Sequence, residues 1–409
     1  MSTSEKNMTD EVKQKKSGIP IYLGIASVWF GAHCGPGVAS GKQTTVFYSE
    51  FGKWAFITPI IAMVLMGLCI YYSVEYARLT KAKNFRELTD NLFHPYERVF
   101  STFFEITFMA TVLMVVGGCI ATGAAVLNEY TGLPITVGSI ILVVVTILFS
   151  MYGANLVRSA STVMTIFIIA CLIAMVVLGL LSSQGDFVGN WKAKSFNDVS
   201  PIKAIVMAVV YTGFQSAGNI ANAVSVSEGI ESKKESKKAA ILGTILNALL
   251  ILGIVFLLFA YPESIKKTLP NYFVADKVGS SVLLFLYVAM VLLAVMSTNV
   301  SFSFSVVARY GEKFPMKPGV KRDFVITLIL MILCVVVSAL GLDAIVSKGY
   351  KYLGYACIFV VVIPIILVGF KKTRSLYKSE YKSECNKVNI KYKKQTLKSL
   401  LFIFYIYLI

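Results

Sequence analysis

Long apolar stretches separated by short polar segments constrain the fold of this chain more than any other feature. Ten such stretches can be delimited, at 19–48, 54–77, 97–127, 133–152, 160–182, 201–227, 239–261, 279–308, 323–341 and 352–370. Each has about the 20 residues that a helix needs to cross a bilayer. Inside lipid, every backbone polar group must be bonded within the protein, and a helix achieves this within one segment. The sequence therefore predicts an all-α integral membrane protein with ten transmembrane helices.

The composition agrees with this prediction and argues against a soluble enzyme. Of the 409 residues, 56% are apolar and 15% are charged, whereas about 25% of residues are charged in soluble domains. The sequence contains no P-loop, no GxSxG and no HExxH motif, so interpretations as an ATPase, a serine hydrolase or a zinc peptidase lack their motifs. The seven cysteines form no CxxC pair or Cys/His cluster. We therefore expect no enzymatic activity, no resident metal and no tightly bound cofactor.

The basic residues predict how the chain is oriented. The formal charge is +17, and 29 of the 39 Lys and Arg residues fall in alternate polar segments, which include the N-terminal residues 1–18 and the tail 371–409. Positive residues mark the cytoplasmic side of a membrane protein. We therefore expect a multi-pass protein of the cell membrane with both termini in the cytoplasm, which an even number of helices requires. The charge then needs no nucleic-acid partner to explain it.

The first apolar stretch contains residues that break a helix. Gly35-Pro36-Gly37 follows its apolar entry, and Pro36 removes a backbone donor and clashes with the preceding turn. The flanking glycines release the backbone from helical geometry. We predict that this helix unwinds near the middle of the bilayer, where freed backbone groups are tolerated only against protein or a wet cavity.

The sixth stretch has a similar run of small and polar residues between Gly213 and Asn219. The first and sixth stretches would begin two five-helix repeats, 19–182 and 201–370, related by inverted topology because each has an odd number of helices. Broken helices in matching positions of two repeats are the best sequence indication of a transporter's central site. The alternative is that these glycines only allow close helix packing.

A resemblance to known transporters follows from these features. The run Gly35-Pro36-Gly37-Val38-Ala39-Ser40-Gly41-Lys42-Gln43 resembles the glycine-rich first-helix motif of YkvI-type membrane proteins, which is usually an ASGQ-like run. The two predicted halves resemble the five-plus-five inverted-repeat fold of the amino acid, polyamine and organocation transporter superfamily. The resemblance implies this fold and a transporter role, without naming a substrate. Lys42 departs from the motif, and three roles are open for it. Its ammonium pairs with an acidic group of the substrate, takes the place of a bound cation, or reaches the outer surface. We favour the last of these.

Candidate substrate-binding residues come from both interruptions. Amide side chains both donate and accept hydrogen bonds and can bind a small zwitterion without adding charge. The helix start after the first break also offers backbone amides and a positive dipole end to a carboxylate. Aromatic residues here either close over a solute or only pack. The predicted substrate site comprises Gly35, Gly37, Val38, Gly213, Phe214, Gln215 and Asn219.

The eighth stretch carries a hydroxyl pair, Ser297 and Thr298. In sodium-coupled members of the similar fold, such a pair binds a sodium ion together with carbonyls of the first helix. The resemblance therefore implies a sodium site formed by Ser297 and Thr298 with the carbonyls near Gly31 and Cys34, and oxygen ligands suit a small hard cation. The alternative is that these hydroxyls bond to their own helix or join neighbouring helices.

Two titratable residues at membrane depth are candidates for proton coupling. Glu105 lies in the third stretch, where it is either a proton relay or a structural counter-ion. His33 lies beside the first break and either titrates near neutral pH or caps freed carbonyls.

Together these observations predict an ion-coupled secondary transporter of a small, amino-acid-like solute, with sodium favoured over protons. A proton-coupled transporter, a non-transporting membrane sensor or scaffold, and a passive channel are the alternatives. Two further segments are predicted outside the spans. Residues 83–93 have helical periodicity beside charges and predict a short helix on the inner membrane surface. The apolar end 400–409 of the basic tail is too short to cross the bilayer.

Overall fold

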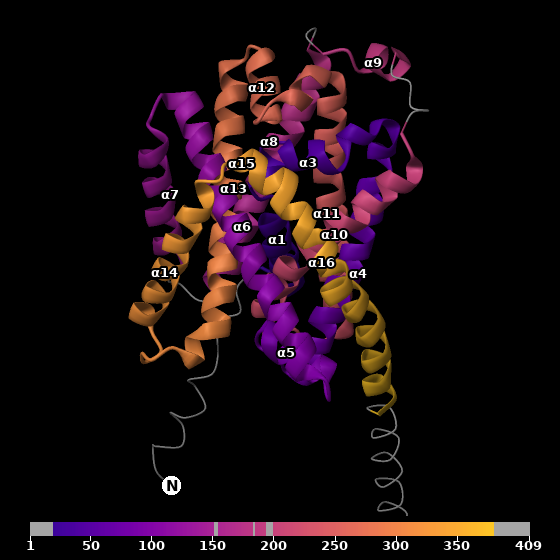
Figure 1. Ribbon diagram of the computed structural model, residues 1–409, viewed down its shortest axis with the longest axis vertical. Coiled ribbons are helices and arrows are strands. Elements are labelled where there is room, and N and C mark those ends of the chain that lie inside the picture. Colours follow the sequence, from indigo (N-terminus) through magenta and orange to yellow (C-terminus); the bar gives the residue numbers. More distant parts are fainter. Residues whose placement is uncertain (1–18, 151–153, 183–184, 194–198, 380–409) are drawn as a thin grey trace, which may run out of the picture.

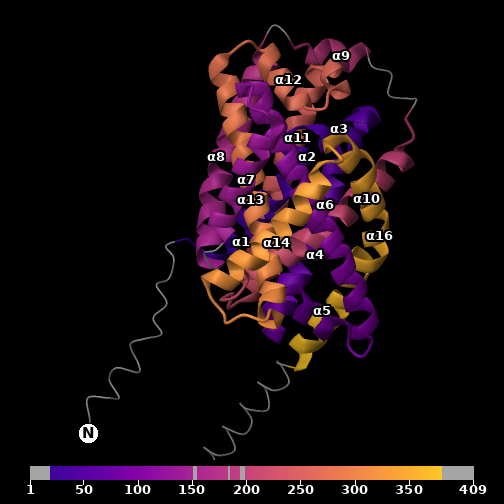
Figure 2. The same ribbon diagram turned by 60° about the vertical axis from the view of Figure 1, so that its left-hand side comes forward.

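The computed structural model describes residues 19–150, 154–182, 185–193 and 199–379. These residues form a bundle of helices, most of which run close to the long axis, with no strand among them (Figures 1 and 2). The predicted N-terminal segment 1–18 and the tail from 380 onward lie outside the described residues. The all-α membrane fold that the apolar stretches predict is confirmed.

The described residues include seven helices that are long and apolar enough to cross a membrane. They are Thr58–Thr80 (α4), Glu97–Thr131 (α6), Ser159–Leu181 within α8 (Ala154–Leu181), Pro201–Ser225 (α10), Lys233–Ala260 (α11), Ser281–Lys313, which contains α13 (Ser281–Tyr310), and Leu342–Ser379, which contains α15 (Leu342–Ala344) and α16 (Tyr350–Cys357). Shorter apolar helices are Ile21–His33 (α1) and Ile135–Ser150 (α7), and Val320–Ser338 (α14) packs on α6 and α7. The count of ten crossings stays a prediction.

The first stretch is interrupted after His33, whereas an unwound backbone in the middle of the bilayer stays a prediction. Helix α1 ends at His33, a short helix α2 (Pro36–Ala39) follows, and α3 (Lys42–Phe47) begins after a second turn. Pro36 occupies the first position of α2, where its missing N–H costs nothing. Gly41 makes the second turn with φ of 84°, a conformation that favours glycine.

The interruption predicted in the sixth stretch is not present, and this part of the prediction is wrong. Helix α10 continues without a break from Pro201 to Ser225. Its glycines serve close packing: a Cβ on Gly213 would lie 2.2 Å from the Gly354 carbonyl oxygen, and one on Gly218 would lie 2.5 Å from the Phe302 ring. The polar side chains do not require an unwound backbone either, because Asn219 and its neighbours bond to carbonyls one turn back in the same helix.

Helix α1 lies in the interior of the bundle, and α10 lies beside it. Helix α1 packs against α8, α10, α11 and α13, and every residue from Gly24 to His33 is buried. The second half of α10 is buried in the same way, from Val210 to Ser225. Helices α1 and α10, which carry the break and the buried amide side chains, therefore lie together in the interior of the bundle, away from the bilayer.

The two ends of the bundle carry different short elements (Figures 1 and 2). One end, called the α5 end here, carries α5 (Phe85–Phe93). This is the helix predicted at 83–93; the Asn84 side chain accepts hydrogen bonds from two of its first N–H groups, and Phe85 packs on Phe108 of α6. The opposite end, called the α12 end, carries α3, α9 (Phe187–Ala193), α12 (Pro270–Lys277) and α15.

Candidate functional site

A buried group of polar side chains lies where α1 is interrupted, and we call it the central cluster. His33 Nε2 lies 2.6 Å from the Tyr211 hydroxyl oxygen, and the Gln215 amide donates to the same hydroxyl at 3.4 Å. Asn219 continues the chain by donating to the Gln215 side-chain oxygen at 3.0 Å. All four side chains are at most 5% exposed. The cluster therefore joins the end of α1 to one face of α10, at positions spaced by one helical turn.

The rest of the central cluster comes from α3, α11 and the residue after α3. Gln43 lies on α3, Asn247 lies on α11 next to His33, and the Tyr48 ring packs against Tyr211 with 5.0 Å between centroids. None of the seven side chains of the cluster, which are His33, Gln43, Tyr48, Tyr211, Gln215, Asn219 and Asn247, is an acid, a lysine or an arginine. A solute bound here would meet amides, phenols and one imidazole, which donate and accept hydrogen bonds without supplying a full charge.

Some polar atoms in and beside the cluster have no hydrogen-bond partner among the described residues. They include the hydroxyl oxygens of Tyr48 and Tyr350 and the side-chain oxygen of Asn219, all in side chains that are fully buried. Leaving a buried polar group unpaired costs about 1–3 kcal/mol, so a protein retains such groups only where something compensates them. Those beside the break in α1 are available to bind a polar ligand there.

Aromatic rings border the cluster. Phe214 of α10 stacks on Tyr350 of α16 with 3.8 Å between ring centroids and 17° between planes. A Cβ on Gly118 of α6 would lie 3.0 Å from the Tyr350 hydroxyl and 3.2 Å from the Pro36 ring. Gly118 therefore lets the break in α1 and this aromatic pair approach α6 closely.

The predicted ion-binding residues come together beside the same break. Thr298 Oγ1 on α13 donates to the Gly31 carbonyl at 2.6 Å. A Cβ on Gly31 would lie 2.1 Å from Ser297 Oγ, so the hydroxyl of Ser297 also faces α1, and it has no partner among the described residues. Cys34 ends α1, with its N–H donating to the Phe30 carbonyl. The Gly31 carbonyl and the two hydroxyls are oxygen ligands of the type that a hard cation prefers.

Glu105 lies away from the central cluster. Its carboxylate binds Arg86 of α5 and Arg309 of α13, each with a nitrogen–oxygen distance of 2.7 Å. The pairs join three elements at the α5 end, and Arg309 is only 8% exposed. This geometry fits the structural counter-ion rather than the proton relay. Sequence reasoning missed the two arginines because no local pattern indicates pairs separated by so many residues.

Lys42 lies at the α12 end. Its ammonium is 2.7 Å from the Asp343 carboxylate at the start of the last helix, and it also donates to the Lys267 carbonyl. Asn271 of α12 binds the adjacent backbone, where its N–H donates to Ser40 and its side chain donates to the Ala39 carbonyl at 3.1 Å. The turn between α2 and α3 is thus held to two elements that are distant in sequence. The Lys42 side chain is 15% exposed, and its position at the outer surface stays a prediction.

A second polar group connects the central cluster with the α5 end. Asn222 follows Asn219 by one turn of α10, and its side-chain oxygen accepts a hydrogen bond of 2.6 Å from Ser305 of α13. Ser225 lies 3.1 Å from the same hydroxyl. Beyond Ser305, one turn along α13, is Arg309.

The predicted substrate residues divide into two sets. Gln215 and Asn219 belong to the central cluster, Phe214 borders it, and Gly35 and Gly37 lie at the break, where a Cβ would approach Thr298 and Gln43 respectively. Val38 is buried, and its carbonyl faces Asn271. Gly213 instead faces Gly354 of α16 and has a packing role. The site residues that the sequence did not indicate are Gln43, Tyr48, Asn247 and Tyr350. For Gln43 and Asn247, an amide side chain within an apolar stretch could have indicated a buried polar site.

Comparisons with known proteins support the fold. No protein-family model and no curated protein matches the chain. Among solved structures, a Na⁺-coupled sialic acid symporter in a substrate-bound outward-open state matches with a TM-score of 0.63 and 15% identity, over 86% of this chain and 79% of that one. MhsT in complex with L-phenylalanine matches with a TM-score of 0.61 and 12% identity, over 87% and 98%. The nucleobase-cation-symport-1 family transporter MHP1 matches with a TM-score of 0.52 and 16% identity, over 88% of this chain and 93% of that one. The chain therefore has the multi-pass helical fold of these membrane transporters.

Proposed function

We propose that this chain is an ion-coupled secondary transporter, a symporter, of a small amino-acid-like solute, working by alternating access around the break between α1 and α2. The observation that carries the proposal is the central cluster, a buried set of uncharged polar side chains that lies at that break and includes unpaired atoms. Breaks of this kind at mid-membrane form the substrate sites of transporters built on inverted repeats. The matched structures are named as transporters and symporters of small solutes, which supports the same function.

The chemistry of the cluster favours a solute without net charge. Gln43, Gln215, Asn219 and Asn247 offer both donors and acceptors, and no carboxylate or ammonium of the protein balances a charged ligand within the cluster. A zwitterion satisfies this condition, because its amine and carboxylate bind dipolar groups and cancel each other's charge. The rings of Phe214 and the residues around it provide an apolar surface for a side chain.

We propose sodium as the coupling ion, bound by the Gly31 carbonyl, the Cys34 carbonyl and the hydroxyls of Ser297 and Thr298. Three of these groups converge between α1 and α13. An ion at this position would tie α13 to the end of α1, and its binding would therefore influence the break at which the solute binds. Glu105 is a weaker coupling group because two arginines already bind it. His33 is the second candidate, since its contact with Tyr211 places a titratable ring inside the cluster.

We propose the α5 end as the cytoplasmic side, because the basic segments 78–98, 229–240 and 308–322 are at that end. The pairs of Glu105 with its arginines then close the inner side, and Lys42 with Asp343 closes the outer side. We further propose 19–182 and 201–370 as the two inverted repeats. Alternating access would break one of these ionic layers at a time.

Uptake into proteoliposomes tests the function. Radiolabelled amino acids and related zwitterions are offered under an imposed sodium gradient, an imposed proton gradient, or neither. We expect uptake of at least one solute that depends on the sodium gradient and is lost in the N219A variant, with a Q43A variant as a second probe of the cluster. Uptake driven only by protons would assign the coupling to His33 instead. No uptake, together with no solute-induced shift of the unfolding temperature, would favour the non-transporting sensor.

A further inference from the structure

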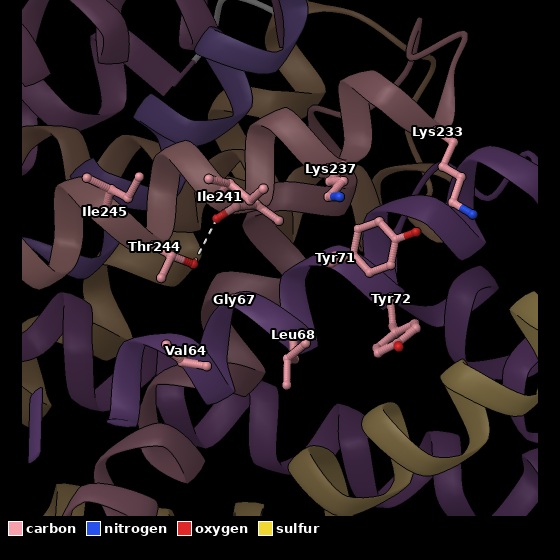
Figure 3. A pocket seen from close by; sticks show the side chains of 11 residues that line it. Val64, Gly67, Leu68, Tyr71, Tyr72, Lys233, Lys237, Ile241, Thr244 and Ile245 are labelled. Carbon is pink, nitrogen blue, oxygen red and sulfur yellow. Dashed lines mark hydrogen bonds between the residues drawn. The ribbon is translucent and has the colours of Figure 1, made fainter. Parts of the chain in front are cut away.

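A surface groove lies between α4 and α11 (Figure 3). None of the residues that line it belongs to the central cluster. Its volume is about 500 Å³. The groove opens on the flank of the bundle, where the side chains that border it are up to half exposed, as for Val64 and Ile245. In a membrane-spanning chain this flank faces lipid and not water.

The groove has an apolar part and a charged part. Its apolar walls are Val64 and Leu68 on α4 and Ile241 and Ile245 on α11. At the end nearest α5, the lining changes to Tyr71 and Tyr72 on α4 and to Lys233 and Lys237 in the first turns of α11 (Figure 3). Because an α-helix rises about 1.5 Å per residue, Ile245 lies about 12 Å beyond Lys237 along α11. The lining is therefore amphipathic along the direction of a lipid chain.

The floor of the groove is formed by close approach of the two helices. A Cβ on Gly67 would lie 2.1 Å from Thr244 Oγ1. The Thr244 hydroxyl donates to the Ala240 carbonyl of its own helix at 2.8 Å, as the dashed line in Figure 3 marks. The floor thus presents no unpaired polar atom from Thr244, which suits an acyl chain lying over it.

The charge at the mouth of the groove is positive and is not cancelled by neighbouring acids. Among the described residues, neither Lys233 nor Lys237 has a carboxylate within salt-bridge distance; the Lys233 ammonium lies 4.2 Å from the Tyr377 ring centroid. Glu75, the nearest acid on α4, is fully buried and engaged by Arg78 at 2.6 Å and by the Tyr377 hydroxyl. Glu235, on the same helix turn, caps α11 by accepting from the Glu231 and Ser232 N–H groups.

We propose that this groove is a binding site for one anionic phospholipid. The headgroup phosphate binds Lys233 and Lys237 with the phenols of Tyr71 and Tyr72 beside it, and an acyl chain lies between the apolar walls over Gly67 and Thr244. Basic pockets between transmembrane helices at the inner leaflet bind anionic headgroups in this way, and tyrosine is enriched at the same depth. The site depends only on a membrane-spanning chain and is independent of transport activity.

Two groove variants and one matched control test the site. K233Q/K237Q removes the headgroup contacts, and L68W fills the acyl part without changing charge, at a position that is 39% exposed and tolerates a larger side chain. K234Q/K238Q removes the same number of charges from the same turns of α11 outside the groove. Purified full-length protein in detergent is titrated with dioleoyl phosphatidylglycerol or dioleoyl phosphatidylcholine, and bound lipid is counted by native mass spectrometry.

We expect one phosphatidylglycerol to remain bound to the wild type and to K234Q/K238Q, with much weaker binding of phosphatidylcholine. Each lysine contributes about 1 kcal/mol, or about fivefold in affinity, so K233Q/K237Q should weaken phosphatidylglycerol binding about 30-fold. L68W should lose the bound lipid, while its thermal unfolding shows that it is still folded. If K234Q/K238Q lost as much bound phosphatidylglycerol as K233Q/K237Q, the binding would depend only on the general surface charge, and the proposal would be overturned. Competition by glycerol phosphate alone would make this a phosphate site, and a change of oligomeric state without a change in bound lipid would make it a subunit interface; either result also overturns it.

Discussion

The ion pairs of Glu105 offer a quantitative test of what holds the α5 end together. In E105Q, Arg309, which is only 8% exposed, loses its carboxylate partner, whereas Arg86 keeps its pair with Asp90 at 2.9 Å. Removing one partner of a buried pair costs about 3–5 kcal/mol, whereas exposed pairs contribute about 0.2–1 kcal/mol. Glu105 is 19% exposed, between these limits but nearer to the buried case. We therefore expect E105Q to lower the free energy of unfolding by about 2–3 kcal/mol.

The comparison variants give this prediction its specificity. R86Q leaves Glu105 bound by both Arg309 nitrogens, so the loss should be about 1 kcal/mol or less. E105Q/R309Q removes the uncompensated buried charge and should recover part of the stability that E105Q loses. Reversible unfolding by a denaturing detergent in mixed micelles measures all three variants. Equal losses in E105Q and R86Q, or no recovery in the double variant, would refute the argument that Arg309 is the buried partner.

Three further predictions follow from other contacts. S297A/T298V removes two proposed ion ligands and should abolish sodium-dependent uptake while the protein stays folded; retained sodium dependence would exclude the ion site. G213L should lower the unfolding temperature as well as uptake, because its side chain meets the backbone of α16 at a distance of 2.2 Å for the Cβ alone; a stable G213L variant would contradict the packing role. D343N breaks the pair with Lys42, and because Asp343 is 52% exposed the loss of stability should be below about 1 kcal/mol, whereas labelling of a cysteine at the break by an outer reagent should become faster.

The fold could be predicted from the sequence because lipid imposes simple rules on it. Apolar length, the basic segments and Pro36 between two glycines each have a local physical meaning, and the structure bears out the helical fold and the interruption after His33. The short helix after Asn84 could be predicted in the same way, from its helical periodicity beside charges.

The site could be predicted only in part, because its contacts are not local. Glycine and amide residues within a helix indicate either an unwound backbone or a packed contact, and the difference depends on the neighbouring helix. For Gly213 that neighbour is Gly354, which the sequence does not pair with it. The same limit applies to Asn247, which reaches the cluster from α11, and to Tyr350, which borders it from α16. The hydroxyls of α13 were identified because a known pattern in similar proteins pointed to them.

The unequal construction of α1 and α10 determines where movement can start. Helix α10 is one continuous helix packed against α4 and α16, whereas α1 is interrupted between His33 and Pro36, with little backbone bonding across the interruption. If the chain cycles as proposed, these two helices cannot bend alike. The half of α1 before the interruption would swing as a lever, with α10 as its fixed support, and the polar face of α10 from Tyr211 to Asn222 would stay in place as the wall along which the solute leaves.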